Sequence, residues 1–347
     1  MTHHPVTAEP TTVTEVVLPG VVEPAGLEVR TRTLPAPTRG QALVAVEASG
    51  VSMAEQAMRR KRYPGQPRFP FVPGYDLVGT VLAVGAGVDA GLVGQRVAAL
   101  TKTGGWASHA LLAAADLVPV PAGLDPAEVE TLVVNGITAW QMLHRRARVR
   151  PGQTILVHGA NGGVGTTLVQ LARHAGVRVI GTASPRHHQA LRELGVLPVD
   201  YSAPDLAAQV RELAPAGVDA VFDHIGGASL VRSRGLLVEG GTLVSYALLK
   251  DTGPMVPAFL AMLARLAWWN ALPAGSSAGF YNVWTGHLLR PARFRARLRD
   301  DLGAVLALLA DGTLTAQVAA RFPLSAVHAA MELAESHTAL GKVVLVP

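Results

Sequence analysis

A glycine-rich turn between an apolar stretch and a helix-like stretch constrains the fold of this chain most strongly. Residues 155–157 are apolar and suit a buried strand, the turn at 159–165 follows, and 166–172 has the pattern of a helix. Small residues in such a turn let the backbone approach phosphates, and the helix N-terminus offers free N–H groups and a positive dipole end. Glycines alone would also suit ordinary turns, but the order strand, turn, helix predicts a dinucleotide pyrophosphate site.

The pattern on either side of this turn predicts a chain of class α/β with two domains. Residues 13 to about 125 hold short β-branched stretches separated by glycine and proline, which favours an antiparallel barrel-like domain. From about residue 127, strands and helices alternate, which predicts a doubly wound parallel sheet. We expect strands at 154–158, 178–182, near 199, 220–223, 241–246 and 280–283, with helices at 165–175, 187–194, 205–213 and 229–237.

The domain boundaries follow from the same pattern. We expect residues 1–127 to form the first domain and 128–290 the dinucleotide-binding domain, with an apolar insertion at 248–279. A long helix at 291–310 begins the final segment, 291–347, and a strand at 343–346 ends it. This last strand is predicted to return to the first domain.

Composition limits the partners. Of 347 residues, 49% are hydrophobic and 16% charged, which argues against disorder, and the lack of cysteine excludes disulfides and thiolate-ligated zinc. The net charge is +5, but the basic clusters at 59–62 and 290–299 are short, so no nucleic-acid partner is expected. The apolar run 255–272 contains Arg265 and is bordered by prolines, which argues against stable membrane insertion. No secretory signal pattern is evident, so a cytoplasmic protein is expected.

The residues after the second expected strand of the parallel sheet favour NADPH. In a dinucleotide-binding unit, an acid about 20 positions beyond the loop binds the ribose hydroxyls of NAD. The corresponding stretch, 181–186, contains no acid. Ser184 offers a hydroxyl and Arg186 a guanidinium that can pair bidentately with the 2′-phosphate of NADPH. Ser184 also suits the cap of the next helix, because Pro185 follows it, and the two roles are compatible.

Further motifs carry a family resemblance. They lie at 50–52, 73–79, 84–85, 94–97, 105–109, 135–139, 158–165 and 341–345. Together they resemble the medium-chain dehydrogenase/reductases, in the zinc-free quinone oxidoreductase branch, from about residue 43 to 347. The resemblance implies a GroES-like β-barrel domain plus a Rossmann domain, with the active site in the cleft between them.

The resemblance also implies that this chain binds no metal. Zinc-dependent relatives have a cysteine after Gly-Val and a His-Glu pair after Pro-Gly. Ser52, Tyr75 and Asp76 occupy these positions here, and the cysteines of a structural zinc lobe are missing. These side chains cannot rebuild a thiolate-containing tetrahedral site.

Cofactor contacts are implied residue by residue. They comprise the pyrophosphate loop (Ala160, Asn161, Gly162, Gly163, Val164 and Gly165), the 2′-phosphate pocket (Ser184, Arg186 and Tyr201), a residue near the nicotinamide ribose (Thr138) and strand-end residues that line the cofactor (Ile225, Ser245 and Tyr246). His187 is a weaker phosphate candidate, because a histidine on a helix surface is commonly just solvated.

The implied activity is hydride transfer from NADPH to a small hydrophobic quinone or α,β-unsaturated carbonyl (enone). Without a metal, the carbonyl oxygen needs hydrogen-bond donors as negative charge develops. Tyr63 is the first candidate and Ser52 the second, although the family has asparagine at the position of Ser52 and a glycine motif before the tyrosine. Tyr75, at the former zinc-ligand position, is expected to line the substrate pocket. Two alternatives stay open: an enoyl-thioester or polyketide enone reductase, and a non-catalytic NADPH-binding protein.

The apolar insertion is longer than in typical quinone oxidoreductases. Its Trp268, Trp269 and Asn270 are similar to the vesicle amine transport protein-like group of the family. An apolar lid over a hydrophobic substrate would use Trp268 and Trp269 as pocket residues, whereas an additional packed helix or a dimer cover would explain them equally well. The family implies a homodimer formed through the edge strand of the Rossmann sheet, which we expect at 280–283.

Overall fold

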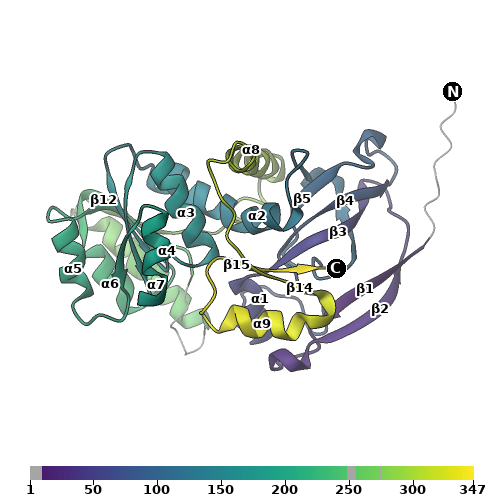
Figure 1. Ribbon diagram of the computed structural model, residues 1–347, viewed down its shortest axis with the longest axis horizontal. Helices are drawn as coiled ribbons and strands as arrows, with labels where there is room; N and C mark the ends of the chain where they lie inside the picture. Colours follow the sequence, from purple (N-terminus) through teal and green to yellow (C-terminus); the bar gives the residue numbers. More distant parts are fainter. Residues whose placement is uncertain (1–9, 248–254, 274) are drawn as a thin grey trace. The chain divides into compact units, whose positions relative to one another are not determined.

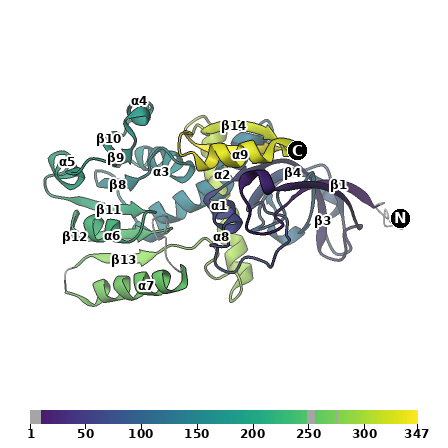
Figure 2. The same ribbon diagram turned by 90° about the horizontal axis from the view of Figure 1, so that it is seen from below.

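The computed structural model describes residues 10–247, 255–273 and 275–347 (Figures 1 and 2). The chain divides into two compact units. Unit 1 comprises 1–135 and 286–347, and unit 2 comprises 136–285. The first division falls inside helix α2 (Pro126–Trp140) rather than at the predicted 127/128, and the second lies at 285/286 rather than 290/291.

Unit 1 is built around a mostly antiparallel sheet. Its strands run in the order β14-β15-β3-β4-β5-β7, β6 pairs with β3, and β1 and β2 form a separate pair. Its elements are β1 (Thr11–Val17), β2 (Glu28–Leu34), β3 (Gln41–Val51), α1 (Met53–Arg59), β4 (Asp76–Val84), β5 (Arg96–Leu100), β6 (His109–Ala113), β7 (Val118–Pro119), most of α2, α8 (Pro291–Ala310), β14 (Val318–Pro323), α9 (Val327–Glu335) and β15 (Lys342–Val346).

The last strand closes unit 1. In β15, Val343 pairs with Val51 of β3, so the last strand of the chain joins the sheet of unit 1. Apolar residues of β3, β4 and β5 such as Val44, Leu77 and Val97 form one core of this unit. Another core joins β15 to α9, which lies beside it in Figure 1. The core of unit 1 is therefore assembled from residues at opposite ends of the sequence.

Unit 2 is a parallel sheet with the strand order β10-β9-β8-β11-β12-β13. This is the doubly wound order, in which the first and fourth strands adjoin and leave a crevice at their carboxyl ends. Its elements are β8 (Thr154–His158), α3 (Gly163–His174), β9 (Arg178–Ala183), α4 (His188–Glu193), β10 (Leu197–Asp200), α5 (Leu206–Leu213), β11 (Val218–Asp223), α6 (Ala228–Arg234), β12 (Leu237–Ser245), α7 (Met255–Ala271) and β13 (Ser277–Phe280).

Two predicted elements begin or end at other residues in the structure. The strand expected at 280–283 is β13, which ends at Phe280 because the Asn282 side chain accepts from Trp284 N at 3.0 Å and the chain turns. The helix expected at 229–237 ends at Arg234, and Gly235 caps it. Both differences lie at element ends, where local hydrogen bonds decide the boundary.

The apolar insertion contains a regular element of unit 2. Parallel strands need a crossover connection, and α7 supplies it between β12 and β13. Figure 2 shows α7 beside β13, and Met262, Leu266 and Trp269 of α7 join the core of the sheet. Residues 248–254 and 274 of the predicted insertion lie outside the described residues. In the part of the chain that is described, no helix is long and apolar enough to cross a membrane.

Candidate functional site

The turn after β8 forms a cradle of small residues, which we call the phosphate cradle (residues 159–165). Gly159 has a φ of 63°, a conformation that favours glycine, and the turn leads directly into α3. A Cβ on Gly165 would clash with the carbonyl oxygen of Gly159 and lie 2.8 Å from Ala160 Cα. Glycine at 165 thus allows helix and turn to pack closely.

The start of α3 faces this cradle without a side-chain cap. Its N-cap is Gly162, and the N–H groups of its first turn have no intrahelical acceptor. Asn161, Gly162, Gly163 and Val164 are half-buried, whereas Ala160 is buried and its N–H donates to Thr182 O at 3.0 Å. Ala160 therefore supports the loop, as does Gly162, whose N–H donates to Gly159 O at 3.0 Å. The N–H groups from Gly163 onward are the ones suited to bind an anion.

Neighbouring side chains fix Gly159 on two sides. Its N–H donates to Thr182 Oγ1 at 3.3 Å, and a Cβ at this position would lie 3.0 Å from His224 Nε2. The His224 ring lies 5.7 Å from that of Tyr246, between ring centroids. His224 is a site residue that sequence reasoning missed, because only Ile225 was selected from this strand end.

The residues expected around a 2′-phosphate lie together. Arg186 Nε donates to Ser184 Oγ at 3.3 Å, while the Ser184 hydroxyl does not cap the following helix in the described structure. Tyr201 is 56% exposed, and its N–H donates at 3.3 Å to the carbonyl oxygen of Ala183, the residue before Ser184. These three residues therefore lie together at the carboxyl ends of β9 and β10.

Two further side chains, His187 and Asp200, lie near the carboxyl ends of β9 and β10. His187 is buried, and its Nε2 has no hydrogen-bond partner among the described residues. Burial and the positive charges of Arg186 and His188 lower the pKa of His187. Asp200, at the end of β10, uses its carboxylate to accept from Ser202 N at 2.9 Å and Ser202 Oγ at 2.8 Å. The orphaned imidazole nitrogen and the Ser184–Arg186 contact fit an anionic group here.

The other residues expected to contact the cofactor, on α2 and at the ends of β11 and β12, are placed less uniformly. Ile225 N donates to Asp223 Oδ1 at 2.8 Å and Tyr246 N to Asp223 O at 3.1 Å, so the strand ends of β11 and β12 meet around Asp223. Burial and the charge of Asp223 raise the pKa of Tyr246, which keeps its phenol protonated. Thr138 is buried on α2.

Ser245 does not suit the predicted cofactor contact. It is fully buried, and its hydroxyl donates to Met262 Sδ at 3.6 Å in the core beneath α7. Its carbonyl oxygen accepts from Tyr281 N at 2.7 Å. Ser245 is thus a core residue that ties β12 to α7 and β13.

In unit 1, two predicted residues form a hydroxyl pair, which we call the tyrosine pair (Tyr63 and Tyr75). Their hydroxyl oxygens lie 2.7 Å apart, and the rings meet edge to face with centroids 5.8 Å apart. Tyr75 is buried and Tyr63 half-buried. Tyr63 is therefore the more accessible of the two donors.

Ser52 has a structural role that accounts for its hydroxyl. It caps α1, where its Oγ accepts from Ala54 N at 3.1 Å and donates to Glu55 Oε2. Glu55 in turn accepts from Ser52 N at 2.9 Å and from Tyr75 N at 2.6 Å. Burial, with the negative charge of Asp76, raises the pKa of Glu55. Glu55 was missed, although Ser-x-x-Glu at 52–55 is the signature of a capping box.

The residues at the positions of the catalytic zinc ligands do not suit the metal. Asp76 is bound to Lys342 Nζ at 2.9 Å and to Val134 N at 2.9 Å, and Lys342 also donates to Glu130 Oε1 at 2.8 Å. Ser52 and Tyr75 are engaged as described, and the chain has no cysteine. Among the residues that the structure describes, no three His, Cys, Asp or Glu side chains gather as metal ligands.

The two tryptophans expected in a lid have different surroundings. Trp269 is 8% exposed in the core of unit 2, and the guanidinium of Arg234 lies 5.1 Å from its ring centroid. This placement corrects the prediction for Trp269, because a side chain packed between α7 and the sheet cannot line a substrate pocket. Trp268, the preceding residue of α7, is 64% exposed, so its pocket role stays a prediction.

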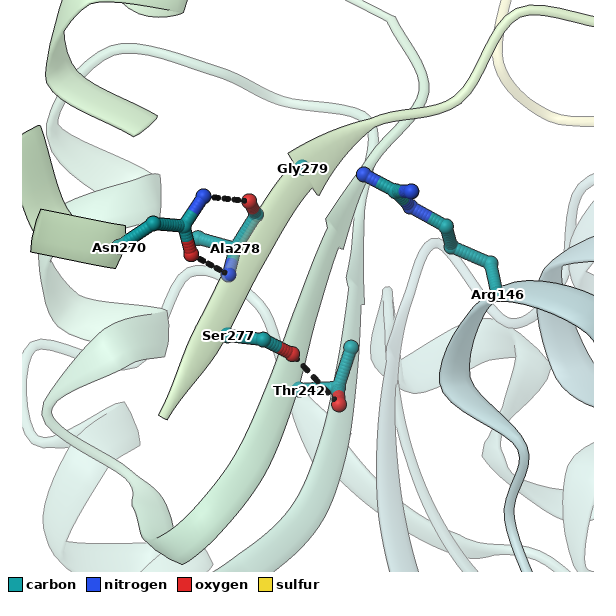
Figure 3. A pocket seen from close by; sticks show the side chains of 6 residues that line it. All are labelled: Arg146, Thr242, Asn270, Ser277, Ala278 and Gly279. Atoms are coloured by element: carbon teal, nitrogen blue, oxygen red, sulfur yellow. Dashed lines mark hydrogen bonds between the residues drawn. The ribbon is translucent and has the colours of Figure 1, made fainter. Parts of the chain in front are cut away.

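A cavity of about 290 Å³ lies at the edge of the sheet and involves none of the predicted residues. Figure 3 shows its lining: Arg146, Thr242, Asn270, Ser277, Ala278 and Gly279. Asn270 accepts from Ala278 N at 2.8 Å and donates to Ala278 O at 2.7 Å. Its amide thereby occupies one residue of the edge strand β13.

Comparisons with known proteins agree with this architecture. Residues 38–122 match the alcohol dehydrogenase GroES-like domain, and residues 194–345 match the zinc-binding dehydrogenase family. The human synaptic vesicle membrane protein VAT-1 homolog is 33% identical over 336 residues, which cover 92% of this chain and 82% of that protein.

Two solved structures are similar along nearly the whole chain. A mycobacterial protein complexed with NADPH has a TM-score of 0.82 and 28% identity, covering 96% of this chain and 100% of that one. A quinone oxidoreductase of Pseudomonas syringae has a TM-score of 0.84 and 26% identity, with the same coverage of both chains. Unit 1 is thus the GroES-like domain and unit 2 the Rossmann domain.

Proposed function

Because the chain belongs to the medium-chain dehydrogenase/reductases, in the zinc-free quinone oxidoreductase branch, we propose that it transfers a hydride from NADPH to a quinone or an enone. The observation that carries the proposal is the Ser184–Arg186 contact beside the phosphate cradle, at a strand end without a carboxylate. The NADPH in the similar mycobacterial structure supports this choice of cofactor.

The residues of unit 2 divide the work of binding NADPH. The free N–H groups at the start of α3 hold the pyrophosphate, and Ser184, Arg186 and Tyr201 bind the adenosine 2′-phosphate. Ile225, Tyr246 and Thr138 orient the nicotinamide end. NADPH supplies the hydride, so these residues serve to position it and to exclude water.

In unit 1, the tyrosine pair serves the substrate. As hydride arrives, negative charge develops on the carbonyl or quinone oxygen, and a donor aimed at that oxygen stabilises it. Tyr63 donates to this oxygen, and the hydroxyl of Tyr75, 2.7 Å away, holds Tyr63 in place. The product takes its proton from water, so the mechanism requires no strong acid. Ser52 acts through α1 rather than on the substrate, because its hydroxyl is committed to Glu55.

NADPH oxidation against a panel of quinones, enones and enoyl thioesters tests the proposal. With NADPH as the donor, we expect faster turnover of quinones or simple enones than of enoyl thioesters. With either kind of acceptor, we expect NADPH to be oxidised faster than NADH. A preference for enoyl thioesters would assign the alternative reductase activity. Tight NADPH binding without turnover on any acceptor would refute the enzyme and favour a non-catalytic NADPH-binding protein.

We further propose a homodimer formed through the edge of the Rossmann sheet. β13 is the last strand of that sheet, and Asn270 covers its Ala278. Pairing with a second copy would therefore use the segment after Ala278. Light scattering measures the mass in solution, and a monomer at all concentrations would contradict this assignment.

A further inference from the structure

A chain of side-chain hydrogen bonds crosses the interior of unit 2 beneath the phosphate cradle. It begins at Gly159 N, which lies 3.3 Å from Thr182 Oγ1, and continues to His158 Nδ1 at 3.2 Å from that hydroxyl. His158 Nε2 lies 3.0 Å from Ser233 Oγ, and Ser233 Oγ lies 2.8 Å from Asp223 Oδ2. The chain thus links the ends of β8, β9 and β11 through one residue of α6.

The other end of this chain is the turn that follows β11. Asp223 Oδ1 accepts from Ile225 N at 2.8 Å and from Gly226 N at 3.1 Å. Ile225 is assigned to the nicotinamide end of the cofactor, whereas Gly159 opens the phosphate cradle. The two ends of the hydrogen-bond chain therefore lie at two different parts of the proposed NADPH site.

The direction of each hydrogen bond follows from its acceptor. An ionised carboxylate only accepts, so Ser233 gives its proton to Asp223, and its oxygen accepts from His158 Nε2–H. A neutral imidazole with its proton on Nε2 has Nδ1 as acceptor, so Thr182 must donate to it. The Thr182 oxygen is then left to accept from Gly159 N. The tautomer with its proton on Nε2 satisfies every link, whereas the other tautomer breaks the link to Ser233, because Nε2 and the Ser233 oxygen would then both be acceptors.

The surroundings keep His158 neutral. Thr182, His158, Ser233 and Asp223 are all buried. Burial lowers the pKa of His158, Asp223 at 3.8 Å opposes that shift, and Arg232 reinforces it. Burial alone would raise the pKa of Asp223, but His158 and the hydrogen bonds from Ser229, Gly226 and Ser233 lower it. The carboxylate therefore stays ionised and the imidazole uncharged near neutral pH.

We propose that His158 is a positioning residue that couples the phosphate cradle to the turn at 223–226, so that both ends of NADPH are held in one arrangement. This inference rests on the proposed function. The link is cooperative, because each hydroxyl accepts one hydrogen bond and donates the next, and such chains polarise one another. Breaking any link weakens the hydrogen bond that holds Gly159, even though no residue between Gly159 and Asp223 has to touch the cofactor.

Two serines of α6 provide a matched pair of variants. Ser229 and Ser233 are both buried, and both donate to Asp223 Oδ2, at 2.7 and 2.8 Å, but only Ser233 also meets His158. We expect Ser233→Ala to weaken NADPH binding about tenfold and Ser229→Ala less than about threefold, as measured by cofactor fluorescence. Equal losses in the two variants would overturn the coupling role, because both remove one hydrogen bond to the same carboxylate.

Thr182 gives a second test if the serine variants fold poorly. Thr182→Ser keeps the hydroxyl and is expected to bind NADPH within about twofold of the wild type, whereas Thr182→Val keeps the shape and is expected to lose about tenfold. Similar affinities for these two variants would overturn the proposal, because packing alone would then explain the position of Thr182.

Hydrogen exchange in the free protein separates this inference from the proposed function. We expect the Gly159 amide to exchange about tenfold faster in Ser233→Ala than in Ser229→Ala. A difference supports the coupling even if the wild type fails to bind NADPH, a result that would contradict only the proposed function. Equal exchange at Gly159 overturns the coupling even if NADPH binds tightly.

Discussion

The phosphate cradle in unit 2 is made of backbone, whereas the tyrosine pair in unit 1 is held by side chains from separate parts of the chain. The cradle depends on Gly159 and Gly165, six positions apart in one turn. The tyrosine pair depends on Glu55, whose carboxylate holds Tyr75 N and the cap of α1. A backbone site thus needs the absence of side chains, and a side-chain site needs particular partners.

This difference determines how each site fails when it is changed. In the cradle, one added methyl group meets rigid backbone, so a small change has a large effect. Around the tyrosines, a lost hydroxyl leaves the ring packing in place, so the effect is confined to hydrogen bonding. Four predictions test this contrast.

The largest effect is expected from Gly165→Ala. The new Cβ would clash with Gly159 O, so loop and helix must separate. We expect a loss of about 1–3 kcal/mol in the free energy of unfolding from overpacking. NADPH affinity should fall by about 100-fold, since displacement breaks hydrogen bonds to charged phosphate. Gly162→Ala is the control for stability, because its Cβ would have only Gly159 O nearby, at 3.5 Å. Equal melting temperatures for the two variants would contradict the packing argument.

Arg186→Ala tests the choice of cofactor. Its guanidinium is expected to contribute a charge-assisted contact to the 2′-phosphate, so NADPH affinity should fall roughly 10- to 100-fold. NADH lacks this phosphate, so its affinity should not change. Arg192→Ala, which removes the same charge from the exposed side of α4, serves as control. If titration shows that Arg186→Ala leaves the preference for NADPH over NADH intact, the 2′-phosphate assignment is wrong.

Much of unit 2 is predictable because its signals are local. The cradle, the end of β9 and the alternation of strands and helices can be read from consecutive residues, and Arg186 donates to Ser184 at the end of β9. Strand ends were less predictable: β13 ends at Phe280 because Asn282 forms a turn. Such local hydrogen bonds compete with a strand pattern that would otherwise continue.

The side-chain contacts could not be predicted, because they join residues far apart in sequence. Lys342 meets Asp76 and Glu130 inside unit 1, and His224 covers Gly159 in unit 2. Trp269 looked like a lid residue because apolar side chains in an insertion and in a crossover helix have the same pattern. Glu55 is the exception, since its capping-box spacing is visible in the sequence.

The tyrosine pair should respond unequally to loss of its hydroxyls. We expect Tyr63→Phe to lower kcat/KM by about 10-fold, because the donor to the developing oxyanion is removed. Tyr75→Phe is expected to lower it only about threefold, because it removes the support of Tyr63 rather than the donor. Steady-state NADPH oxidation measures both. The reverse order would identify Tyr75 as the donor, and no effect in either variant would exclude the pair from the reaction.

The smallest effect is a pH dependence of stability that arises at Glu130, which shares Lys342 with Asp76, the residue after Tyr75. Burial and the charge of Asp76 raise the pKa of Glu130 well above its ordinary value, although Lys342 opposes the shift. At pH values between the ordinary pKa of a glutamate and the raised pKa of Glu130, the folded protein keeps a proton that the unfolded chain releases. The free energy of unfolding therefore falls as pH rises through this range, by at most about 1.4 kcal/mol per pH unit for one proton. Glu130→Gln keeps an oxygen acceptor for Lys342 and cannot ionise, so urea unfolding from pH 5 to 8 should show a shallower decline. Glu128→Gln, two residues earlier on α2, should keep the slope of the wild type, and a slope that survives Glu130→Gln would assign the buried proton to another group of unit 1.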